Sequence, residues 1–313
     1  MCHDRLRLAR RPGGHRARPR YHRPRACADC DARSASRRAL RILTLTYLDH
    51  IIAHHRRRAA ADPRSLSTAR AAAETSRNAA QTAHGGGPVR DFVSALQGDS
   101  LAVIAEIKRR SPSRGALNES LDPAEMAQRY TAGGASCLSV LTDEPHFGGS
   151  SDDLRRARGA TGVPVLRKDF TVSALDVIDA YAMGADCVLL IVAALSDDEL
   201  ATFHRLASDL GLAALIEVHD EAELQRALRI NPRLIGVNQR DLRTFQVDRD
   251  RAVRVAAEIP DGVVGVAESG ITGGADAARL AEAGYRAVLV GEHLVTSANV
   301  EASLRELRLA LPS

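Results

Sequence analysis

Lysine is almost absent from this chain. Of its 43 basic residues only two are lysines, Lys108 and Lys168, and each stands where a predicted β-strand ends. An ammonium group has a pKa of about 10.4 that its surroundings can lower, whereas a guanidinium keeps its proton in proteins. A chain that uses arginine for nearly every positive charge therefore keeps lysine where a proton must be donated or an anion held. We interpret both lysines as acid catalysts or as ligands of phosphate and carboxylate, rather than as ordinary surface cations.

Cysteines and long apolar runs are scarce as well. Five scattered cysteines are too few for a disulfide framework, and Cys137 and Cys187 fall inside apolar strand patterns, as small buried residues do in a reducing compartment. Cys27 and Cys30 form half of a zinc pattern without a second pair at usable spacing. No stretch approaches the roughly 18 apolar residues of a membrane span, and no secretory signal is recognisable. We therefore expect a cytoplasmic protein without a membrane partner.

The positive net charge of +4 is concentrated at one end. Residues 1–41 contain 13 arginines and three aspartates, a local charge of +10, so the rest of the chain carries −6. The remainder is an acidic domain with no basic face for nucleic acid. We expect the Arg-rich tail, residues 1–41, to be disordered or to result from a start codon assigned too far upstream.

From residue 101 onward, short apolar runs alternate eight times with longer helical stretches. Most of the runs are continuously apolar, which is typical of parallel strands covered on both faces. Helix start signals such as Ser196 with Glu199, and glycines such as Gly184 after helix ends, lie between them. Eight such units predict a (β/α)8 TIM barrel over residues 99–313. The lack of a Gly-x-Gly-x-x-Gly fingerprint disfavours an open doubly wound sheet. The predicted strands are Leu101–Ile107, Cys137–Thr142, Val163–Asp169, Cys187–Val192, Ala213–Val218, Leu234–Asn238, Val263–Glu268 and Ala287–Gly291.

Residues 42–98 precede the barrel and are predicted to form a helical extension with a linker. The run Thr46-Tyr47-Leu48-Asp49 begins an amphipathic helix, and Asp91-Phe92-Val93 with Leu96 indicates a second short one. Between them, Ser65–Gly87 is rich in Ala, Ser, Thr and Gly, and we expect a loosely packed connection there.

Charged and amide side chains gather where the predicted strands end, which is where TIM barrels carry their reactive groups. Glu106 and Lys108 are two residues apart and project to the same side of their strand. We expect opposite charges to keep Glu217 ionised as a base, and neighbouring cations to lower a lysine pKa toward a value suited to proton donation. A purely structural ion-pair network is the alternative, but such pairs are costly to desolvate. The strand-end groups are Glu106, Lys108, Lys168, Asp169, Glu217, His219, Asn238, Glu268 and Glu292.

The loops after the last two predicted strands favour phosphate binding. The segment 269–274, with three glycines, and Gly291 offer backbone N–H groups at helix N-termini, the usual phosphate pocket of these barrels. The segment 111–115 after the first strand predicts a flexible loop that closes over the mouth. An apolar wall is expected from Phe147, Phe170, Leu189 and Ile191, although a core role suits the last two equally well.

Five motifs together resemble the indole-3-glycerol-phosphate synthase family of tryptophan biosynthesis. The first and fourth are long and specific, and the resemblance runs from about Leu43 to Leu311. It includes the helix at Thr46, which packs over the catalytic end of the barrel in that family. The motifs are Ala105–Ser113, Leu166–Phe170, Leu215–Asp220, Ile235–Leu242 and Ala267–Ile271.

The resemblance implies a reaction in which 1-(2-carboxyphenylamino)-1-deoxyribulose 5-phosphate closes its ring and loses carbon dioxide and water. Lys108 and Lys168 would share the acid steps and Glu217 would act as the base. The resemblance implies no metal and no organic cofactor. It implies a small phosphorylated substrate, and we expect a monomer or a weak homo-oligomer. By the same resemblance, Glu106 and Asn238 would orient the substrate hydroxyls and the lysines, and Arg240 would support the site. The residues implied at the substrate phosphate are Ser111, Ser269, Gly270, Gly291 and Glu292. Those implied along the anthranilate ring are Phe147, Phe170, Leu189 and Ile191. The run Gly291-Glu292-His293 departs from the small or hydroxylated residues frequent there, which favours a backbone contact to phosphate.

Two other readings compete with this one. Phosphoribosylanthranilate isomerase is a related phosphate-binding barrel, but its chemistry resembles a Cys and Asp pair, and the first predicted strand has no cysteine. In the second alternative, this chain is a barrel that has lost its catalytic activity, and its Arg-rich tail binds RNA or an acidic partner. The retained set of Glu106, Lys108, Lys168, Glu217 and Asn238 argues against loss of catalysis.

Overall fold

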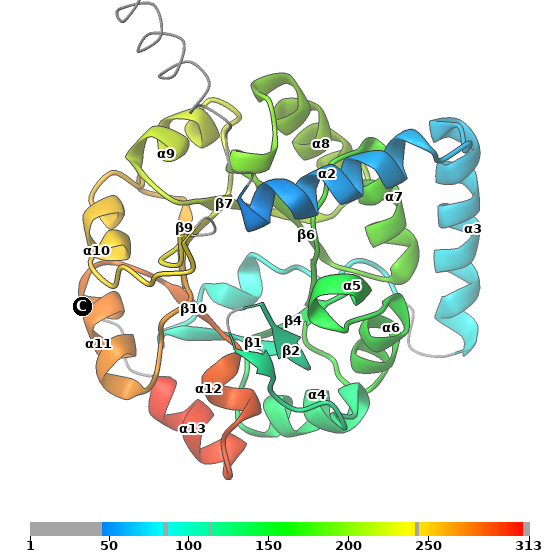
Figure 1. The fold of residues 1–313 in the computed structure, drawn as a ribbon. Coiled ribbons are helices and arrows are strands. Elements are labelled where there is room, and N and C mark those ends of the chain that lie inside the picture. The colour runs from blue at the N-terminus through cyan, green and yellow to red at the C-terminus, as the bar shows by residue number, and fades with distance from the viewer. Residues whose placement is uncertain (1–45, 84–86, 113, 242–243, 309–313) are drawn as a thin grey trace, which may run out of the picture. The chain divides into compact units, whose positions relative to one another are not determined.

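A closed barrel of parallel strands forms the centre of the protein. The computed structural model describes residues 46–83, 87–112, 114–241 and 244–308 of the 313. Within them, eight strands pair in the order β1-β10-β9-β8-β7-β6-β5-β4, and β1 closes the ring by pairing with both β10 and β4 (Figure 1). The predicted TIM barrel is confirmed. The strands are β1 (Ala102–Ile107), β4 (Cys137–Leu141), β5 (Val165–Lys168), β6 (Cys187–Ile191), β7 (Ala213–Val218), β8 (Leu234–Asn238), β9 (Val264–Glu268) and β10 (Ala287–Val290).

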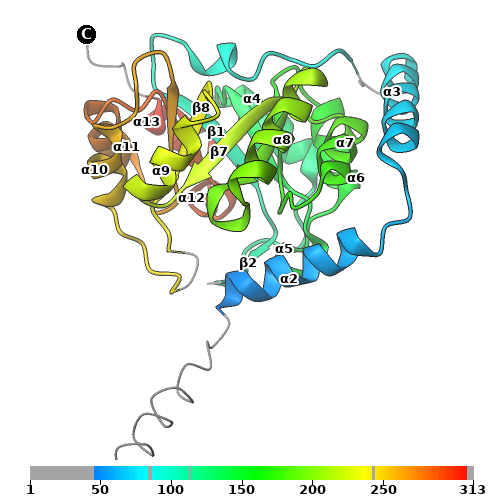
Figure 2. The same cartoon turned by 90° about the horizontal axis from the view of Figure 1, so that it is seen from above.

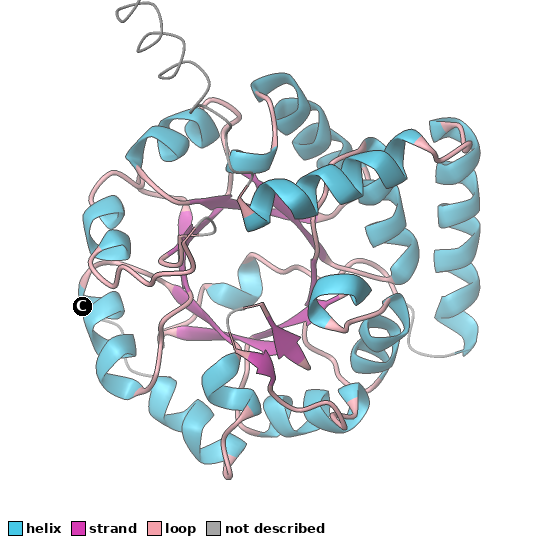
Figure 3. Cartoon of the chain, viewed as in Figure 1, coloured by secondary structure: helices cyan, strands magenta, loops and turns pink. Residues whose placement is uncertain are grey.

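Helices surround the strands on the outside (Figure 3). Their ends follow the expected signals: the Ser196 hydroxyl and the Glu199 carboxylate form a capping box on α8, and Gly184 ends α7 with a left-handed φ of 94°. The α-helices are α2 (Tyr47–Ala60), α3 (Leu66–Ala83), α4 (Pro123–Ala132), α5 (Glu144–Phe147), α6 (Ser151–Gly159), α7 (Ala174–Met183), α8 (Asp197–Asp209), α9 (Glu221–Leu228), α10 (Arg251–Ala256), α11 (Gly274–Glu282), α12 (Glu292–Val295) and α13 (Val300–Leu307). Two 3-10 turns, η1 (Ser94–Leu96) and η2 (Val192–Ala194), and a small hairpin, β2 (Arg110–Ser111) with β3 (Gly115–Ala116), complete the order.

Strand alternation divides the core into an inner and an outer part. On β1, Ala102 and Ile104 belong to the apolar cluster inside the barrel, whereas Val103 and Ala105 belong to the cluster shared with the helices. Because side chains alternate along a strand, Glu106 falls on the inner side, above Ile104. The pleat of β1 therefore directs a carboxylate into the barrel mouth.

The two ends of the barrel are covered by different parts of the extension. Phe92 and Leu96 are buried in the inner cluster, and the Phe92 carbonyl accepts a hydrogen bond from Cys137 at the start of β4. Helix α2 lies on the opposite side, next to β2 and α5 (Figure 2). It begins with a capping box between Thr46 and Asp49, as the sequence predicts.

The expected loose connection over Ser65–Gly87 is wrong, because most of this segment is helix α3. Ala69, Ala73 and Arg77 recur every four residues and form one buried face beside α7 (Figure 1). Arg77 donates to the carbonyls of Tyr181 and Ala185, both at 2.9 Å. Alanine is the best helix former, but its small side chain gives little apolar periodicity in the sequence. The pattern therefore looked like a linker although it encodes a packed helix.

Packing of α3 can be tested with a pair of alanines. Ala73→Asp is expected to lower the free energy of unfolding by about 2 kcal/mol, because it buries a carboxylate against α7, and the nearby Arg77 already donates to the carbonyls of Tyr181 and Ala185. The matched control is Ala71→Asp on the exposed face of the same helix, which is expected to stay within about 0.5 kcal/mol of wild type. Urea unfolding measures both values, and equal losses would contradict the packed helix.

Residues 1–41 lie outside the described residues, and the expectations for the Arg-rich tail and for Cys27 and Cys30 lie there too. Within the described ranges, no helix has the length and apolar character needed to cross a membrane.

Candidate active site

A cavity of about 850 Å³ opens at the C-terminal ends of the barrel strands. Helix α2 contributes Tyr47, Leu48 and Ile51 to its wall, so the extension is part of the cavity. The residues predicted for catalysis and substrate binding all line this cavity: Glu106, Lys108, Ser111, Phe147, Lys168, Phe170, Leu189, Ile191, Glu217, Asn238, Arg240, Ser269, Gly270, Gly291 and Glu292. Of the other strand-end groups that the sequence indicates, Asp169 and Glu268 also line the cavity, whereas His219 does not. The fold thus brings together residues that are up to 186 positions apart.

Lys108 is held by the carboxylate at the end of its own strand. Its Nζ lies 2.7 Å from Glu106 Oε1, and Ser139 donates to the other Glu106 oxygen at 3.3 Å. Burial alone would raise the pKa of Glu106, but Lys108 and then Lys168 outweigh burial and hold that pKa below its ordinary value. Glu106 is therefore an anion that fixes the position of the Lys108 ammonium.

Lys168 lies among carboxylates from two other strands. Its Nζ donates to Glu217 Oε2 at 3.1 Å and lies 3.5 Å from Glu268 Oε2. Burial favours a lower pKa for Lys168, but the surrounding carboxylates, led by Glu217, raise it well above its ordinary value. The expectation that neighbouring cations lower a lysine pKa is wrong for Lys168, because anions are its nearest neighbours. Without substrate, this ammonium keeps its proton.

Glu217 combines burial with a negative charge. Burial would raise its pKa, but Lys168 and His219 lower it below the ordinary value, which keeps the carboxylate ionised. Asn238 on β8 donates to Glu217 Oε1 at 3.2 Å, and the Asn238 side-chain oxygen accepts the Arg240 backbone N–H at 3.0 Å. Arg240 in turn donates to the Phe245 carbonyl at 3.1 Å, which ties the loop after β8 to the site. This ionised, oriented carboxylate has the state that a general base needs.

Sequence reasoning placed Glu268 among the strand-end groups but gave it no role. Burial raises the pKa of Glu268 to about 8, with further contributions from Glu217 and Glu106, although Lys168 opposes them. The carboxyl group fits because Gly236 on the adjacent strand has no side chain: a Cβ there would lie 2.1 Å from Glu268 Oε1. Its position at the end of a strand, like that of Glu217, is the sequence feature that could have indicated a role in the site. Glu268 therefore holds its proton to a higher pH than an ordinary glutamate does.

The loops after β9 and β10 form another part of the cavity wall. Ser269 and Gly270 have left-handed φ angles of 67° and 73°, a conformation that costs a serine about 1 kcal/mol. A Cβ at Gly291 would lie 2.5 Å from Glu106 Oε1, so only glycine allows this close approach. Further along the loop, two backbone amides already donate within the protein. The Thr272 N–H donates to the Asp276 carboxylate at 2.8 Å, and the Gly274 N–H donates to the Glu306 carboxylate at 2.9 Å. The amides of the start of α11 are therefore engaged within the protein.

The loop after β1, which the sequence predicts to be flexible, contains a short hairpin. Its two ends pair as the antiparallel hairpin of β2 and β3, and Arg114 forms an ion pair with Glu292 at 3.0 Å. This contact ties the hairpin to α12 across the cavity rim. Glu292 therefore positions a loop in this structure.

Aromatic and aliphatic side chains form the apolar wall. Phe147 and Phe170 have ring centroids 6.5 Å apart, and Leu189 and Ile191 extend from β6 toward the same cavity. Both β6 side chains also belong to the inner core cluster, so their core and cavity roles coincide.

The sequence of the described domain matches a known family along nearly all its length. A sequence profile described as indole-3-glycerol phosphate synthase matches residues 48–307. The chain belongs to the indole-3-glycerol phosphate synthase family. Members of this family are carboxy-lyases of tryptophan biosynthesis.

Relatives in the indole-3-glycerol phosphate synthase family share about half of their residues with this chain. The synthase of a Nocardioides species is 51% identical over 220 residues, which cover 70% of this chain and 85% of the relative. The synthase of Mycobacteroides abscessus is 51% identical over 217 residues, covering 69% and 80%, and that of Streptomyces griseus is 49% identical over 218 residues, covering 70% and 81%.

Solved structures of other enzymes share the barrel at low identity. Thiamine phosphate pyrophosphorylase from Pyrococcus furiosus superposes with a TM-score of 0.51 at 15% identity, covering 69% of this chain and 96% of that one. A 3-hexulose-6-phosphate synthase gives 0.51 at 14% identity, covering 68% and 100%. At these identities the likeness concerns the fold alone.

The raised pKa of Glu268 predicts how stability depends on pH. The folded chain retains this proton up to about pH 8, whereas the unfolded chain releases it near the ordinary value of 4.5. Because the folded state binds more protons in this window, its stabilising contribution is lost as the pH rises. The free energy of unfolding of wild type, relative to that of Glu268→Gln, is expected to fall by roughly 3 to 4 kcal/mol between pH 5 and pH 8. Urea unfolding at several pH values measures it, and parallel profiles for the two proteins would refute the assignment.

Proposed function

We propose that the chain converts 1-(2-carboxyphenylamino)-1-deoxyribulose 5-phosphate into indole-3-glycerol phosphate, carbon dioxide and water. The observation that carries the proposal is the placement of two ammonium groups in one cavity, each held by carboxylates. Lys108 pairs with Glu106, and Lys168 pairs with Glu217 and Glu268. Ring closure and dehydration both need acids near the ribulose oxygen, and the last step needs a base.

In the first half of the proposed reaction, the anthranilate ring carbon that bears the carboxylate attacks the ribulose carbonyl. One of the two lysines donates a proton to the carbonyl oxygen, which becomes a hydroxyl group. The carboxylate then leaves as carbon dioxide, and its bonding electrons restore the aromatic ring. Phe147 and Phe170 offer aromatic faces for the ring, and Ile191 an aliphatic one.

In the second half, the new hydroxyl group leaves as water with a proton from the other lysine. Glu217 removes the last proton from the carbon next to nitrogen, which completes the indole. Its ionised state suits this role, and Asn238 holds the carboxylate in place. Because its carboxylate partners keep Lys168 protonated, the substrate must weaken one of these ion pairs before the lysine can donate.

The phosphate group of the substrate is assigned to the rim formed by Ser111, Ser269, Gly270 and Gly291. Backbone N–H groups can approach a phosphate closely where side chains are small, and these positions are serine or glycine. Glu292 is not a favourable phosphate ligand because its carboxylate is occupied by Arg114.

The proposed activity is tested by incubating the purified full-length protein with the carboxyphenylamino sugar phosphate. We expect indole fluorescence to appear together with one equivalent of carbon dioxide, and indole-3-glycerol phosphate as the product by mass. Fluorescence without carbon dioxide release, or no turnover by folded protein, would refute the proposal.

A further inference from the structure

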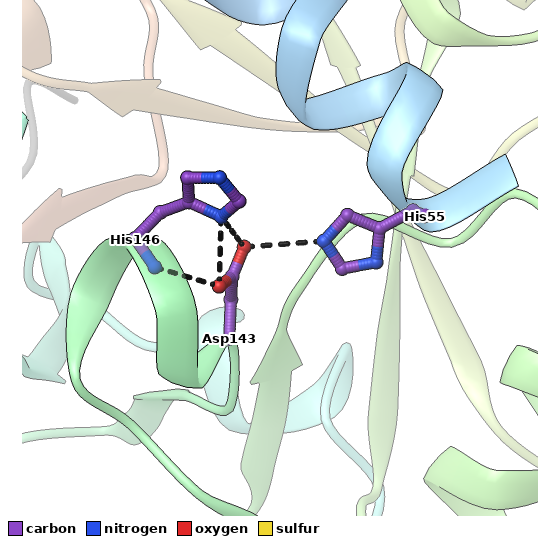
Figure 4. Close-up of side chains that lie close together, drawn as sticks. All are labelled: His55, Asp143 and His146. Carbon is purple, nitrogen blue, oxygen red and sulfur yellow. Dashed lines mark hydrogen bonds and ion pairs between the residues drawn. The ribbon is translucent and has the colours of Figure 1, made fainter. Parts of the chain in front are cut away.

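Two histidines and an aspartate meet between helix α2 and the loop after β4 (Figure 4). His55 Nε2 lies 3.2 Å from Asp143 Oδ2, and His146 Nδ1 lies 2.9 Å from the same oxygen. The three candidate ligand atoms lie within 4.8 Å of one another. His55 is 88 residues from Asp143, so no local sequence pattern indicates this cluster.

The cluster borders the catalytic cavity, which Asp143 lines, but it does not include any residue assigned to the proposed chemistry. His55 and Asp143 are each about 2% exposed, and His146 is partly buried. Asp143 also caps α5 by accepting the His146 backbone N–H at 3.0 Å, which fixes its carboxylate between the two rings.

We propose that His55, Asp143 and His146 bind a divalent transition-metal ion of the Zn²⁺ class. Two imidazole nitrogens and one carboxylate oxygen are a ligand set that Zn²⁺ uses in proteins, with bonds of about 2.0–2.2 Å. In tetrahedral coordination the ligand atoms on one ion are about 3.4 Å apart, so the most distant pair of the cluster, at up to 4.8 Å, needs to approach by up to about 1.4 Å. Water, or the exposed His54, whose ring centre is 5.8 Å from that of His146, completes the coordination.

The affinity of the site is limited by its surroundings. His55 Nδ1 is buried and has no hydrogen-bond partner among the described residues. With a metal on Nε2, the Nδ1 atom carries the proton and lacks the acceptor that usually orients a metal-bound imidazole, a loss worth about 10–100-fold in affinity. We therefore expect binding in the micromolar range, not the tight binding of a structural zinc site.

A bound ion would connect two walls of the catalytic cavity. Helix α2 supplies Tyr47, Leu48 and Ile51 to that cavity, and α5 supplies Phe147. The ion would cross-link these elements through His55 and His146 and hold α2 against the barrel. Binding is therefore expected to raise the unfolding temperature. This proposal does not depend on the proposed enzymatic activity.

The experiment is a calorimetric titration of the untagged full-length protein with Zn²⁺, together with thermal unfolding. His146→Phe keeps an aromatic ring beside Tyr47 but removes the ligand, and His55→Gln removes the other imidazole. His50→Ala, an exposed histidine on α2, is the matched control. We expect wild type and control to bind one more equivalent of Zn²⁺ than either site variant, and saturation to raise their unfolding temperature by roughly 5 °C.

Zinc held elsewhere in the chain, for instance by the tail cysteines, would be common to all four proteins and would cancel in this comparison. Equal stoichiometry and equal thermal shifts in wild type and both site variants would overturn the proposal. Loss of the extra equivalent in His146→Phe, with an unfolding temperature in the absence of metal close to that of wild type, would support it even if His55→Gln failed to fold.

Discussion

Lys168→Arg is expected to lower the turnover of the carboxyphenylamino sugar phosphate by about 100-fold or more. The substitution keeps the positive charge between Glu217 and Glu268 but replaces a transferable proton with one that a guanidinium does not release. Since arginine serves elsewhere in this chain as the general cation, its failure at this position would show that charge alone is insufficient.

Steady-state kinetics on wild type and Lys168→Arg measure the effect. The larger guanidinium has to fit a buried site, so thermal unfolding should accompany the assay, and Lys168→Met provides a smaller second variant. Both folded variants are expected to lose activity. Turnover of Lys168→Arg within a few-fold of wild type would show that Lys168 acts as a cation and not as an acid.

Glu217→Gln is expected to reduce turnover by about 100-fold, with a much smaller change in KM. The amide has the shape of the carboxylate but cannot accept a proton as a base. It also removes the strongest anionic partner of Lys168, which lowers the pKa of that lysine toward its ordinary value. The base step should become limiting even though proton donation becomes easier.

A matched control for Glu217→Gln exists on helix α9. Glu223 accepts a hydrogen bond from the same histidine, His219, at 3.0 Å but does not line the cavity. Glu223→Gln is expected to change turnover by less than about threefold. If both variants lost activity equally, the effect would arise through His219, and Glu217 would not be the base.

The barrel was predictable because its signals are local. Each predicted strand lies within one or two residues of an observed one, since continuous runs such as the one ending in Val218 can be buried on both faces only in a parallel sheet. The end of each strand then fixes where Lys108, Lys168 and Glu217 lie. Because the fold brings the strand ends together, a sequence pattern can predict that these residues line one cavity.

Other features depend on distances that no local pattern contains. The pKa of Lys168 depends on how many carboxylates surround its ammonium, and Glu268 was not counted among them. Helix α3 was missed because alanine packs closely while giving a weak apolar signal. The cluster of His55 and Asp143 joins two segments that only the folded chain brings together. In each case the missing information was a contact between elements.

The most direct test of the account compares indole formation by wild type, Lys108→Ala and Lys168→Ala on the carboxyphenylamino sugar phosphate. We expect fluorescence from wild type and its loss, by about 100-fold or more, in both folded variants. A folded wild-type protein that forms no indole, or an alanine variant that retains most of the activity, would contradict the claim that this pair of lysines performs the acid steps of ring closure.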